Sequence, residues 1–338
     1  MCYNKVRCDN CNYRNNPNIK DLSRSFFYAL MEVMHLREVL LIEDEKIIEH
    51  RELKDNEDIN INKKKKDLTP KQLRIVSNKK EIKKHCGQLG GFVHMLCIRN
   101  KLLFQDVGID RANISRIIFL ATYLDYNNRQ QGLLIKHGKN NKVEALKRKD
   151  LIKLLNLKED TFKSFLKDVT SHNLMYIADD KYYINPSYFN KGENEFDNKE
   201  YTRLFINSIR YIYNNCPARQ HKNLSYVYQL IPFMNYELNI VCSNPLEVDF
   251  YKLNKLSLKD ICKLLAVDTS SKRNMYKLRD KLLQFYVVID GQRFYLFSYV
   301  RVLNGYGLKD YFAINPYVVW AGNDMEELRK TLQILFFK

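Results

Sequence analysis

The chain has 338 residues, of which 45 % are hydrophobic, and a formal net charge of +17 at pH 7. This length suits two or three domains, and seven Pro with eleven Gly exclude a fibrous or linker-like chain. No apolar run reaches the roughly 18–20 residues of a membrane span, and no signal-peptide core begins the chain. We therefore expect a cytoplasmic protein whose eight Cys are reduced thiols.

The basic excess predicts a polyanionic partner, and double-stranded DNA is the first candidate. The chain is also rich in Lys, Asn, Ile and Tyr, a composition that AT-rich genomes favour. Charge alone therefore does not identify the partner, and the prediction of DNA binding depends on the motifs along the chain.

The N-terminal region, residues 1–105, is predicted to be helical. Apolar side chains recur at near-helical spacing over residues 21–53, which predicts a first helix. A polar, Lys-rich stretch near residues 55–69 is typical of a solvated linker. A second helix is expected from Pro70 to about His85, where a glycine-rich turn ends it.

Cys2, Cys8 and Cys11 place three thiols close together near the N-terminus. Zinc in structural sites takes four ligands, and the fourth is missing at the usual spacing. A fourth ligand would have to fold back from His35, His50 or the His85-Cys86 pair. Zinc held by these cysteines is the one cofactor that the sequence suggests, and a polar N-terminus without metal is the alternative.

Two blocks of the sequence occur twice at the same offset. Residues 114–126 return at 224–236, and residues 149–157 return at 259–267, both 110 positions later. The motif Ile184-Asn185-Pro186 also returns, but 130 positions later. Two separate blocks at one offset indicate an internal duplication, in which the second copy is longer by about 20 residues.

The first copy begins with a predicted helix over residues 114–126. A short helix over Arg148–Leu155, a tight turn and a third helix over about 161–172 follow. Two β-rich runs around Ala178-Asp179-Asp180-Lys181 predict a hairpin. This order is typical of a winged helix, in which the third helix enters the DNA major groove and the hairpin is the wing. The alternative is a small α+β module that does not bind nucleic acid.

The second copy repeats this order. Its helix-turn-helix is predicted over residues 258–265 and a third helix that ends near Leu283. Its wing is expected at residues 286–297, and Asn304-Gly305 predicts an additional hairpin. The Asn-Pro pair after each wing is expected to end a strand, because Pro has no N–H to donate.

The predicted fold is therefore α+β and mainly helical, with two tandem winged-helix domains after a helical N-terminal region. The three parts are expected at residues 1–105, 106–200 and 201–338, and the last carries the extended wing. No motif predicts an enzyme. Gly87-x-x-Gly90-Gly91 lacks the context of a phosphate or dinucleotide loop, and no nucleophile–His arrangement is present.

The residues predicted to touch DNA lie on the outward faces of the two third helices. They are Lys158, Thr161, Lys163, Ser164 and Lys167 in the first copy, Ser270, Ser271, Lys272, Arg273, Asn274, Lys277 and Lys281 in the second, and Arg293 in the second wing. Arg and Asn pair bidentately with guanine and adenine, so Arg273 and Asn274 are the predicted base readers and the Lys residues the phosphate contacts. The alternative is that these Lys side chains are only solvated.

Local charge is similar in the two helix-turn-helix segments. Residues 136–167 hold ten Lys and Arg against four Asp and Glu, and residues 255–281 hold eight against three. A duplicated phosphate-binding surface predicts such a match. The wings differ, since Asp179-Asp180-Lys181 is acidic and Gly291-Gln292-Arg293 is not. The second copy is therefore expected to be the more sequence-specific.

The duplicated plan resembles the tandem winged-helix replication initiators of plasmids and phages of low-GC Gram-positive bacteria, over about residues 110–325. The resemblance rests on a first helix that ends in Tyr123-Leu124-Asp125-Tyr126, and on Tyr183-Ile184-Asn185-Pro186 followed by Phe189 and Gly192. It implies binding of repeated origin sites on double-stranded DNA, dimer–monomer control and recruitment of host replication proteins.

Two other functions fit the same residues. One is a winged-helix transcriptional regulator, in which the N-terminal helices form a homodimer. The other is a phage-type protein-interaction factor whose winged helices bind protein. A membrane partner is not expected for any of the three.

Overall fold

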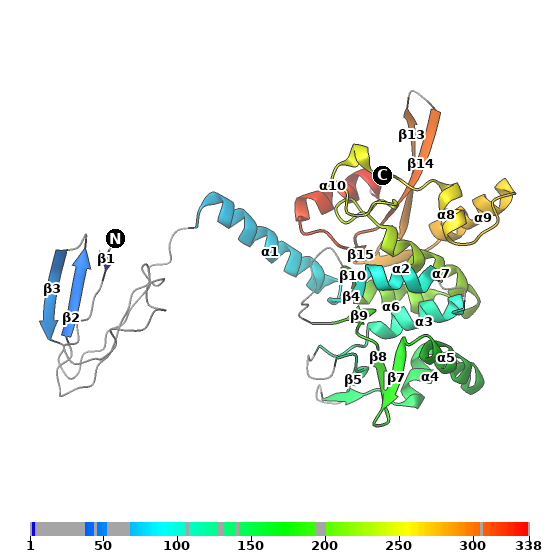
Figure 1. The fold of residues 1–338 in the computed structure, drawn as a ribbon, viewed down its shortest axis with the longest axis horizontal. Helices are drawn as coiled ribbons and strands as arrows, with labels where there is room; N and C mark the ends of the chain where they lie inside the picture. The colour runs from blue at the N-terminus through cyan, green and yellow to red at the C-terminus, as the bar shows by residue number, and fades with distance from the viewer. Residues whose placement is uncertain are drawn as a thin grey trace. The chain divides into compact units, whose positions relative to one another are not determined.

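The computed structural model describes residues 68–105, 108–126, 131–138, 142–192, 201–304 and 307–336, together with three N-terminal strands. Contacts divide the chain between Leu68 and Thr69 into two units, which are described separately. The predicted linker near 55–69 ends at this division, and most of it lies outside the described residues. The second unit, cyan to red in Figure 1, holds both copies of the duplication.

The described part of the first unit is an antiparallel sheet in the order β1-β2-β3. Its strands are β1 (Cys2–Tyr3), β2 (Glu38–Glu43) and β3 (Lys46–Glu52). The prediction of a helix over residues 21–53 is therefore wrong where β2 and β3 lie. Residues 21–37 lie outside the described part. Short apolar runs fit a helix or a strand equally well by spacing, and the β-branched Val39, Ile42 and Ile47 favour the strand.

The second unit begins with α1 (Pro70–Gln88), which confirms the second predicted helix. The Thr69 hydroxyl accepts from the Gln72 N–H, and the Gln72 side chain accepts from the Thr69 N–H, which closes a capping box. Gly90, with a φ of +77°, then turns the chain. A Cβ at Gly90 would collide with the Asn207 side chain, so this turn requires glycine.

A four-stranded antiparallel sheet in the order β15-β10-β4-β9 lies in the second unit. Its strands are β4 (Phe92–Leu96), β9 (Phe189–Asn190), β10 (Tyr201–Phe205) and β15 (Val319–Trp320). Within each copy the first strand pairs with the last, and the two first strands pair with each other. Together these pairs join the two copies through one sheet.

This sheet has an internal two-fold axis. Met95 pairs with Phe189 and Leu204 pairs with Val319, and Phe189 and Val319 each lie four residues after the Asn of an Asn-Pro motif. Met95 and Leu204 therefore hold equivalent positions in the two copies. His94 and Arg203, each one residue earlier, are equivalent as well. His94 and Arg203 are also the residues that pair at the middle of β4 and β10. An antiparallel pair is two-fold symmetric about the point where equivalent residues meet.

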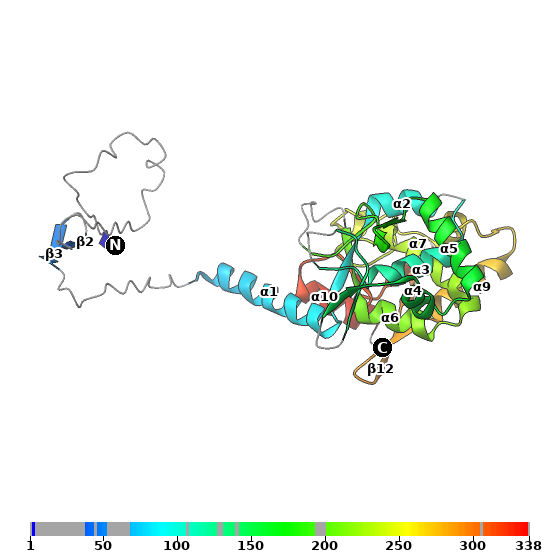
Figure 2. The same ribbon diagram turned by 90° about the horizontal axis from the view of Figure 1, so that it is seen from below.

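Helices cover both faces of this sheet (Figures 1 and 2). One face carries α2 (Cys97–Gln105), α3 (Arg111–Ala121), α6 (Ile206–Asn215) and α7 (His221–Leu230). The other carries α1 and α10 (Met325–Leu335). Strand side chains alternate between these layers, so that Met95 and Leu204 enter one core while Phe205 and Trp320 enter the other.

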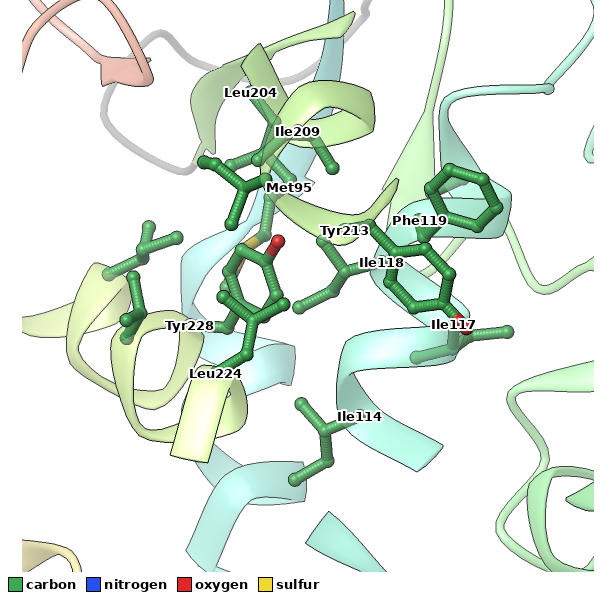
Figure 3. Packing of buried hydrophobic residues seen from close by; sticks show 14 of the residues in the cluster. Met95, Ile114, Ile117, Ile118, Phe119, Leu204, Ile209, Tyr213, Leu224 and Tyr228 are labelled. Carbon is green, nitrogen blue, oxygen red and sulfur yellow. The ribbon is translucent and has the colours of Figure 1, made fainter. Parts of the chain in front are cut away.

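The larger core runs through both copies (Figure 3). The equivalent helices α3 and α7 pack against each other, and the Ser115 hydroxyl donates to the His221 carbonyl at 2.8 Å. The Phe119 and Tyr213 rings stack with centroids 4.0 Å apart. The predicted parts 106–200 and 201–338 thus share one core, and α1, β4 and α2 of the predicted N-terminal region belong to the same unit.

The first copy continues from α3 into a hairpin and a pair of helices. The elements are β5 (Ile135–His137), β6 (Val143–Ala145), α4 (Arg148–Leu155), α5 (Glu159–Ser171), β7 (Met175–Ala178) and β8 (Lys181–Ile184). Both predicted helices and the β7–β8 hairpin are confirmed, whereas the β5–β6 hairpin was not expected. Asp179 and Asp180 form the β7–β8 turn with φ of 48° and 55°.

Among the described residues, two hairpins follow the third helix of the second copy, whereas one follows the third helix of the first. The elements of the second copy after α7 are α8 (Leu258–Leu264), α9 (Lys272–Leu283), β11 (Tyr286–Ile289), β12 (Gln292–Tyr295), β13 (Phe297–Asn304) and β14 (Gly307–Ile314). Short 3₁₀ helices span Ala218–Gln220, Ile231–Phe233 and Phe250–Lys252. In the described part of the chain, no helix combines the length and apolar character needed to cross a bilayer.

Equivalent hydrogen bonds show which hairpin corresponds to β7–β8. Asn185 donates its backbone N–H and its side-chain amide to the carbonyls of residues 173–174, just before β7. Asn315 donates in the same way to residues 295–296, just before β13. The counterpart of β7–β8 is therefore β13–β14. The hairpin expected as that counterpart, at 286–297, is instead an insertion, since the sequence offered two β-rich candidates of similar composition.

Candidate nucleic-acid interface

α5 is held by α4 and by the core of the first copy. Phe162 and Phe165 are buried and fix its inner side. Arg148 on α4 contacts Glu159 at 2.5 Å and lies 5.0 Å from the centre of the Phe162 ring, so it joins the two helices. The outward residues predicted for this copy are all exposed, namely Lys158, Thr161, Lys163, Ser164 and Lys167.

The outward face of α5 is not basic. Among its exposed residues Lys163 and Lys167 stand against Glu159 and Asp160, whereas Asp168 is half-buried and accepts from the Asn113 amide and the Asp110 N–H. Lys163 lies 3.6 Å from Asp160, and the Ser164 hydroxyl donates to the Asp160 carbonyl at 3.1 Å. The basic excess counted over residues 136–167 therefore belongs to α4 and the chain before it. The similar charge of the two helix-turn-helix segments therefore does not extend to their third helices, because a count over a segment does not resolve the faces of a helix.

α9 presents a basic outward face. Leu278 and Leu282 are buried and fix its inner side. Over Lys272–Leu283 five Lys and Arg stand against one Asp. Four of these cations are exposed and form no ion pair with any described residue, namely Lys272, Arg273, Lys277 and Lys281. This face has the charge that a phosphate-contacting helix needs.

The turn before α9 is three residues longer than the turn before α5. Asn156 and Ala266 hold equivalent left-handed positions after the preceding helices, and α5 then begins at 159 but α9 at 272. In the longer turn Asp268 accepts from the side chains of Ser270 and Asn274 at 2.8 and 3.0 Å. Hydrogen bonds, first that from the Ser270 N–H, hold the pKa of Asp268 below its usual range.

These bonds separate the two predicted base readers. The Asn274 amide is engaged with Asp268 and half-buried, so in this conformation it orders the turn. Ser271 is also half-buried, at the N-cap position of α9, and Ser270 is exposed but bonded to Asp268. Arg273 is exposed and has no polar partner among the described residues. Of the two candidates, Arg273 alone has the geometry of a reader.

Alternating Arg and Tyr side chains connect α9 to β13. The Arg279 guanidinium lies 4.9 Å from the ring centre of Tyr276 and 5.8 Å from that of Tyr299. Arg301 lies 5.2 Å from the same Tyr299 ring, whose hydroxyl donates to Asp310. Sequence reasoning missed this row. The available signal was the three-residue spacing of Tyr276 and Arg279, which places both on one side of a helix.

Arg293 lies on the inserted hairpin. Its guanidinium is 4.2 Å from the centre of the Tyr286 ring, and Tyr286 lies 6.3 Å from Tyr211 of α6. β11 packs against α6, whereas β13 packs against α9. The structure therefore groups Arg293 with α6 rather than with the other residues predicted to contact DNA.

The β7–β8 hairpin of the first copy is aromatic and acidic. Tyr176 and Tyr183 stack with their ring centres 5.0 Å apart, and Tyr176 and Ile177 are 41 % and 48 % exposed. Asp179 and Asp180 form the tip. Neither the rings nor the carboxylates attract phosphate, so this hairpin differs in chemistry from its counterpart β13–β14.

The described residues contain no group of three or more His, Cys, Asp or Glu placed to hold a metal. Cys8 and Cys11 of the predicted zinc site lie outside the described residues, and Cys2 is in β1. His85 and Cys86 are buried beside Phe205 and the other residues of the α1–α10 core. All five described cysteines of the second unit are free and buried, as expected of reduced thiols.

Figures 1 and 2 both show α5 and α9 on the same side of the second unit, away from α1. Searches against protein families, curated proteins and solved structures find no match for this chain.

Proposed function

We propose that each copy is a winged helix and that the protein binds double-stranded DNA sequence-specifically, as a replication initiator of plasmid or phage type. The observation that carries this proposal is the outward face of α9. Its four exposed cations have no acidic partner among the described residues, and unpaired Lys and Arg on a helix are the usual contacts to DNA phosphates and bases.

Strand contacts support the winged-helix interpretation in both copies. The chain between α3 and α4 bridges from Leu133 to Tyr183 of β8, and the equivalent chain bridges from Ile240 to Ala313 of β14. Each copy therefore has three helices and a small sheet in the order helix, strand, two helices and hairpin. A third helix exposed on the outside of such a unit fits the major groove.

The second copy is proposed as the main DNA contact. Arg273 reads a base, while Lys272, Lys277 and Lys281 contact phosphates on either side. Arg301, beside the Tyr299 ring, adds positive charge where β13 meets α9, whereas the charge of Arg279 is paired with Asp280. The first copy lies on the same side and adds fewer phosphate contacts, because the exposed side of α5 has as many acidic as basic residues.

The proposal is tested by titrating the full chain against labelled duplexes from the DNA around its gene, at several salt concentrations. About six phosphate contacts give a log–log salt slope near −5. A flat slope on every duplex would contradict DNA binding. Footprinting then separates the roles, since regularly spaced repeats support an initiator and a single palindrome supports a transcriptional regulator.

A matched pair of variants tests the face itself. Lys272→Gln with Lys277→Gln and Lys281→Gln removes three charges from α9, and Lys71→Gln with Lys80→Gln and Lys84→Gln removes three from exposed positions on α1. The α9 variant is expected to lose most of the affinity at moderate salt, while the α1 variant retains it. Equal losses would mean that only total charge matters.

Protein binding by the first copy is a second candidate function. The exposed Tyr176 and Ile177 with the acidic tip at Asp179 favour it, because such surfaces suit protein rather than phosphate. A host replication protein is the partner that an initiator would need. Tyr176→Ser with Ile177→Ser should then abolish replication of a test plasmid while duplex binding persists. Unchanged replication would remove this candidate.

A further inference from the structure

An open pocket of about 420 Å³ lies between α1 and the face of the central sheet that α1 covers. Its walls include a buried guanidinium, a buried imidazole, two ammonium groups and two further aromatic rings. These belong to Arg203, His94, Lys79, Lys83, Phe92 and Tyr201. None of them lies on the proposed DNA-binding helix, so the pocket does not depend on the proposed function.

Arg203 is a buried cation without a counter-ion. Its side chain is held by bonds to the Gly322 carbonyl at 2.8 Å and to Asn323 Oδ1 at 2.5 Å. The residue is 8 % exposed, and among the described residues no carboxylate pairs with it. A buried charge of this kind is costly unless an opposite charge approaches it. The pocket gives an anion that access.

His94 adds an unsatisfied polar atom to the same wall. The residue is 5 % exposed, and its Nδ1 has no hydrogen-bond partner in the described part of the chain. Burial, and then the charge of Arg203, lower the pKa of His94 to about 4, so the ring is neutral at pH 7. A neutral imidazole offers one hydrogen bond to a ligand that enters the pocket.

Two lysines of α1 line the pocket beside these groups. Lys79 and Lys83 are one helical turn apart, both exposed, and neither makes an ion pair with a described residue. The nearby Glu81 is not their partner in the structure, because Arg329 of α10 binds it at 2.6 Å. Three cations thus surround one space in which no described acidic side chain takes part.

The remaining wall is aromatic. The Phe92 ring lies 4.9 Å from His94, and His94 lies 4.2 Å from Tyr201, each pair edge to face. The three rings form a row on the outer face of β4 and β10. An inorganic anion would meet the cations but leave this row and most of the volume unused.

We propose that this pocket binds a small molecule that carries phosphate groups and an aromatic ring, the size of a mononucleotide. The volume lies within the range of about 300–1,000 Å³ that small-molecule sites occupy. Arg203, Lys79 and Lys83 hold the phosphates, and the ring lies along Phe92 and Tyr201. The Cys86 thiol also lines the pocket, and burial raises its pKa, which favours the protonated form.

The duplication explains why the pocket occurs on one side of the axis. His94 and Arg203 hold equivalent positions, yet the Arg203 side chain donates to the backbone of Gly322 in its own copy, whereas the Nδ1 of the shorter His94 side chain has no hydrogen-bond partner in the described part of the chain. Gly192 lines the pocket instead. The space has thus opened where the smaller residue of the pair lies.

Calorimetric titration of the full chain with ATP tests the proposal, with tripolyphosphate as the second probe. ATP is expected to bind one saturable site and to bind more tightly than tripolyphosphate, because only ATP uses the rings. Lys79→Gln with Lys83→Gln should weaken ATP about tenfold, the effect of losing two charge-assisted contacts. Lys80→Gln with Lys84→Gln makes the same charge change on the same helix, outside the pocket lining, and should leave affinity unchanged.

Three results would overturn the site. They are no saturable binding of either probe, equal losses in the two double variants, and tripolyphosphate binding as tightly as ATP. Duplex binding is measured on the same proteins. If the Lys79/Lys83 variant loses DNA affinity in parallel, these lysines contact a DNA phosphate and the pocket assignment fails. If the wild type binds ATP but no duplex, the proposed function fails and the pocket stands.

Discussion

α5 and α9 hold equivalent positions in the two copies, and they differ most on the side that faces outward. Their inner sides both bury apolar residues, Phe162 and Phe165 in one helix and Leu278 and Leu282 in the other. On the exposed side, α5 has two basic residues and two acidic ones, and α9 has four basic residues against one acidic. After duplication the packing that maintains the fold was retained, while the surfaces diverged. If the protein binds DNA as proposed, the comparison predicts that the second copy provides most of the affinity.

The largest expected effect tests whether the copies fold together. Phe162→Ala should lower the free energy of unfolding by about 3–5 kcal/mol, and Leu282→Ala by about 2–5 kcal/mol. Because both side chains belong to one core, each variant should unfold the second unit in a single transition. Trp320, the only Trp, reports on the central sheet by fluorescence. Thr161→Ala, exposed on α5, is the control, and two separate transitions would show independent copies.

The second effect is the pH dependence that His221 contributes in the second copy. His221 begins α7, and its counterpart 110 residues earlier is Arg111. Burial lowers the pKa of His221 to about 4, so between pH 6.5 and 4 the unfolded chain binds a proton that the folded chain does not. Stability is therefore lost as pH falls through this window, by about 3 kcal/mol for this residue.

Urea unfolding across that window measures the loss. His221→Gln should remove about 3 kcal/mol of the pH dependence. The remainder should persist, because burial lowers the pKa values of His85 and His94 to about 4 as well. His137→Gln, at an exposed position, is the matched control. An unchanged profile in the His221 variant would place the pH sensitivity elsewhere.

The third prediction compares the outward faces directly. Neutralising Lys272, Lys277 and Lys281 should reduce the salt slope of DNA binding by about 3, one for each phosphate contact. Neutralising Lys163 and Lys167 on α5 should reduce it by less than one per residue. Fluorescence anisotropy on one duplex at several salt concentrations gives both slopes. An equal change in salt slope per lysine would mean that the two copies contribute equally to DNA binding, which would contradict the difference inferred between α5 and α9.

The smallest effect separates Arg273 from its neighbour. Arg273→Ala should cost about 1–3 kcal/mol at one base pair and little on other sequences. Asn274→Ala should instead cost about 0.5–1.5 kcal/mol of stability, because its bond to Asp268 is lost. Binding to a panel of single-base variants, together with thermal unfolding, measures both. A uniform loss of affinity in Arg273→Ala would mean that Arg273 contacts phosphate.

Sequence patterns predicted the elements that combine periodicity with clear end signals. α4 lies at the predicted residues, and the Asp179-Asp180 turn confirms the first hairpin. Patterns failed where two conformations share one spacing, as in the strands at Glu38–Glu43 and Lys46–Glu52. An apolar run of that length does not select a helix or a strand without its partners.

The central sheet could not be predicted from the repeat. β4 and β10 are equivalent, but no residue of Phe92–Leu96 is identical to its counterpart in Tyr201–Phe205. Only the alternation of large apolar residues is common to them, and pairing between distant strands leaves no local signal. The pocket beside Arg203 was hidden for the same reason, since it depends on α1, β4 and β10 meeting in space.

The residues predicted to contact DNA were expected to be exposed. All of them are exposed except Ser271 and Asn274, which are half-buried. The sequence did not show which partner each of these side chains would bind. Asn274 has a residue type suited to reading adenine, yet its amide is bound to Asp268. Tyr299 and Arg301 were overlooked because their value depends on the approach of β13 to α9.

The strand order β15-β10-β4-β9 has a consequence for the history of the chain. Each copy pairs its own first and last strands, and within the described sheet the copies meet through β4 and β10 on a two-fold axis. That is the geometry of a homodimer of a single-copy ancestor, later joined by gene fusion. Fusion removed the requirement that both halves stay identical, so the outward faces of α5 and α9 could diverge. The two halves, expressed as separate polypeptides cut between Gly192 and Tyr201, should accordingly reassemble into one fold.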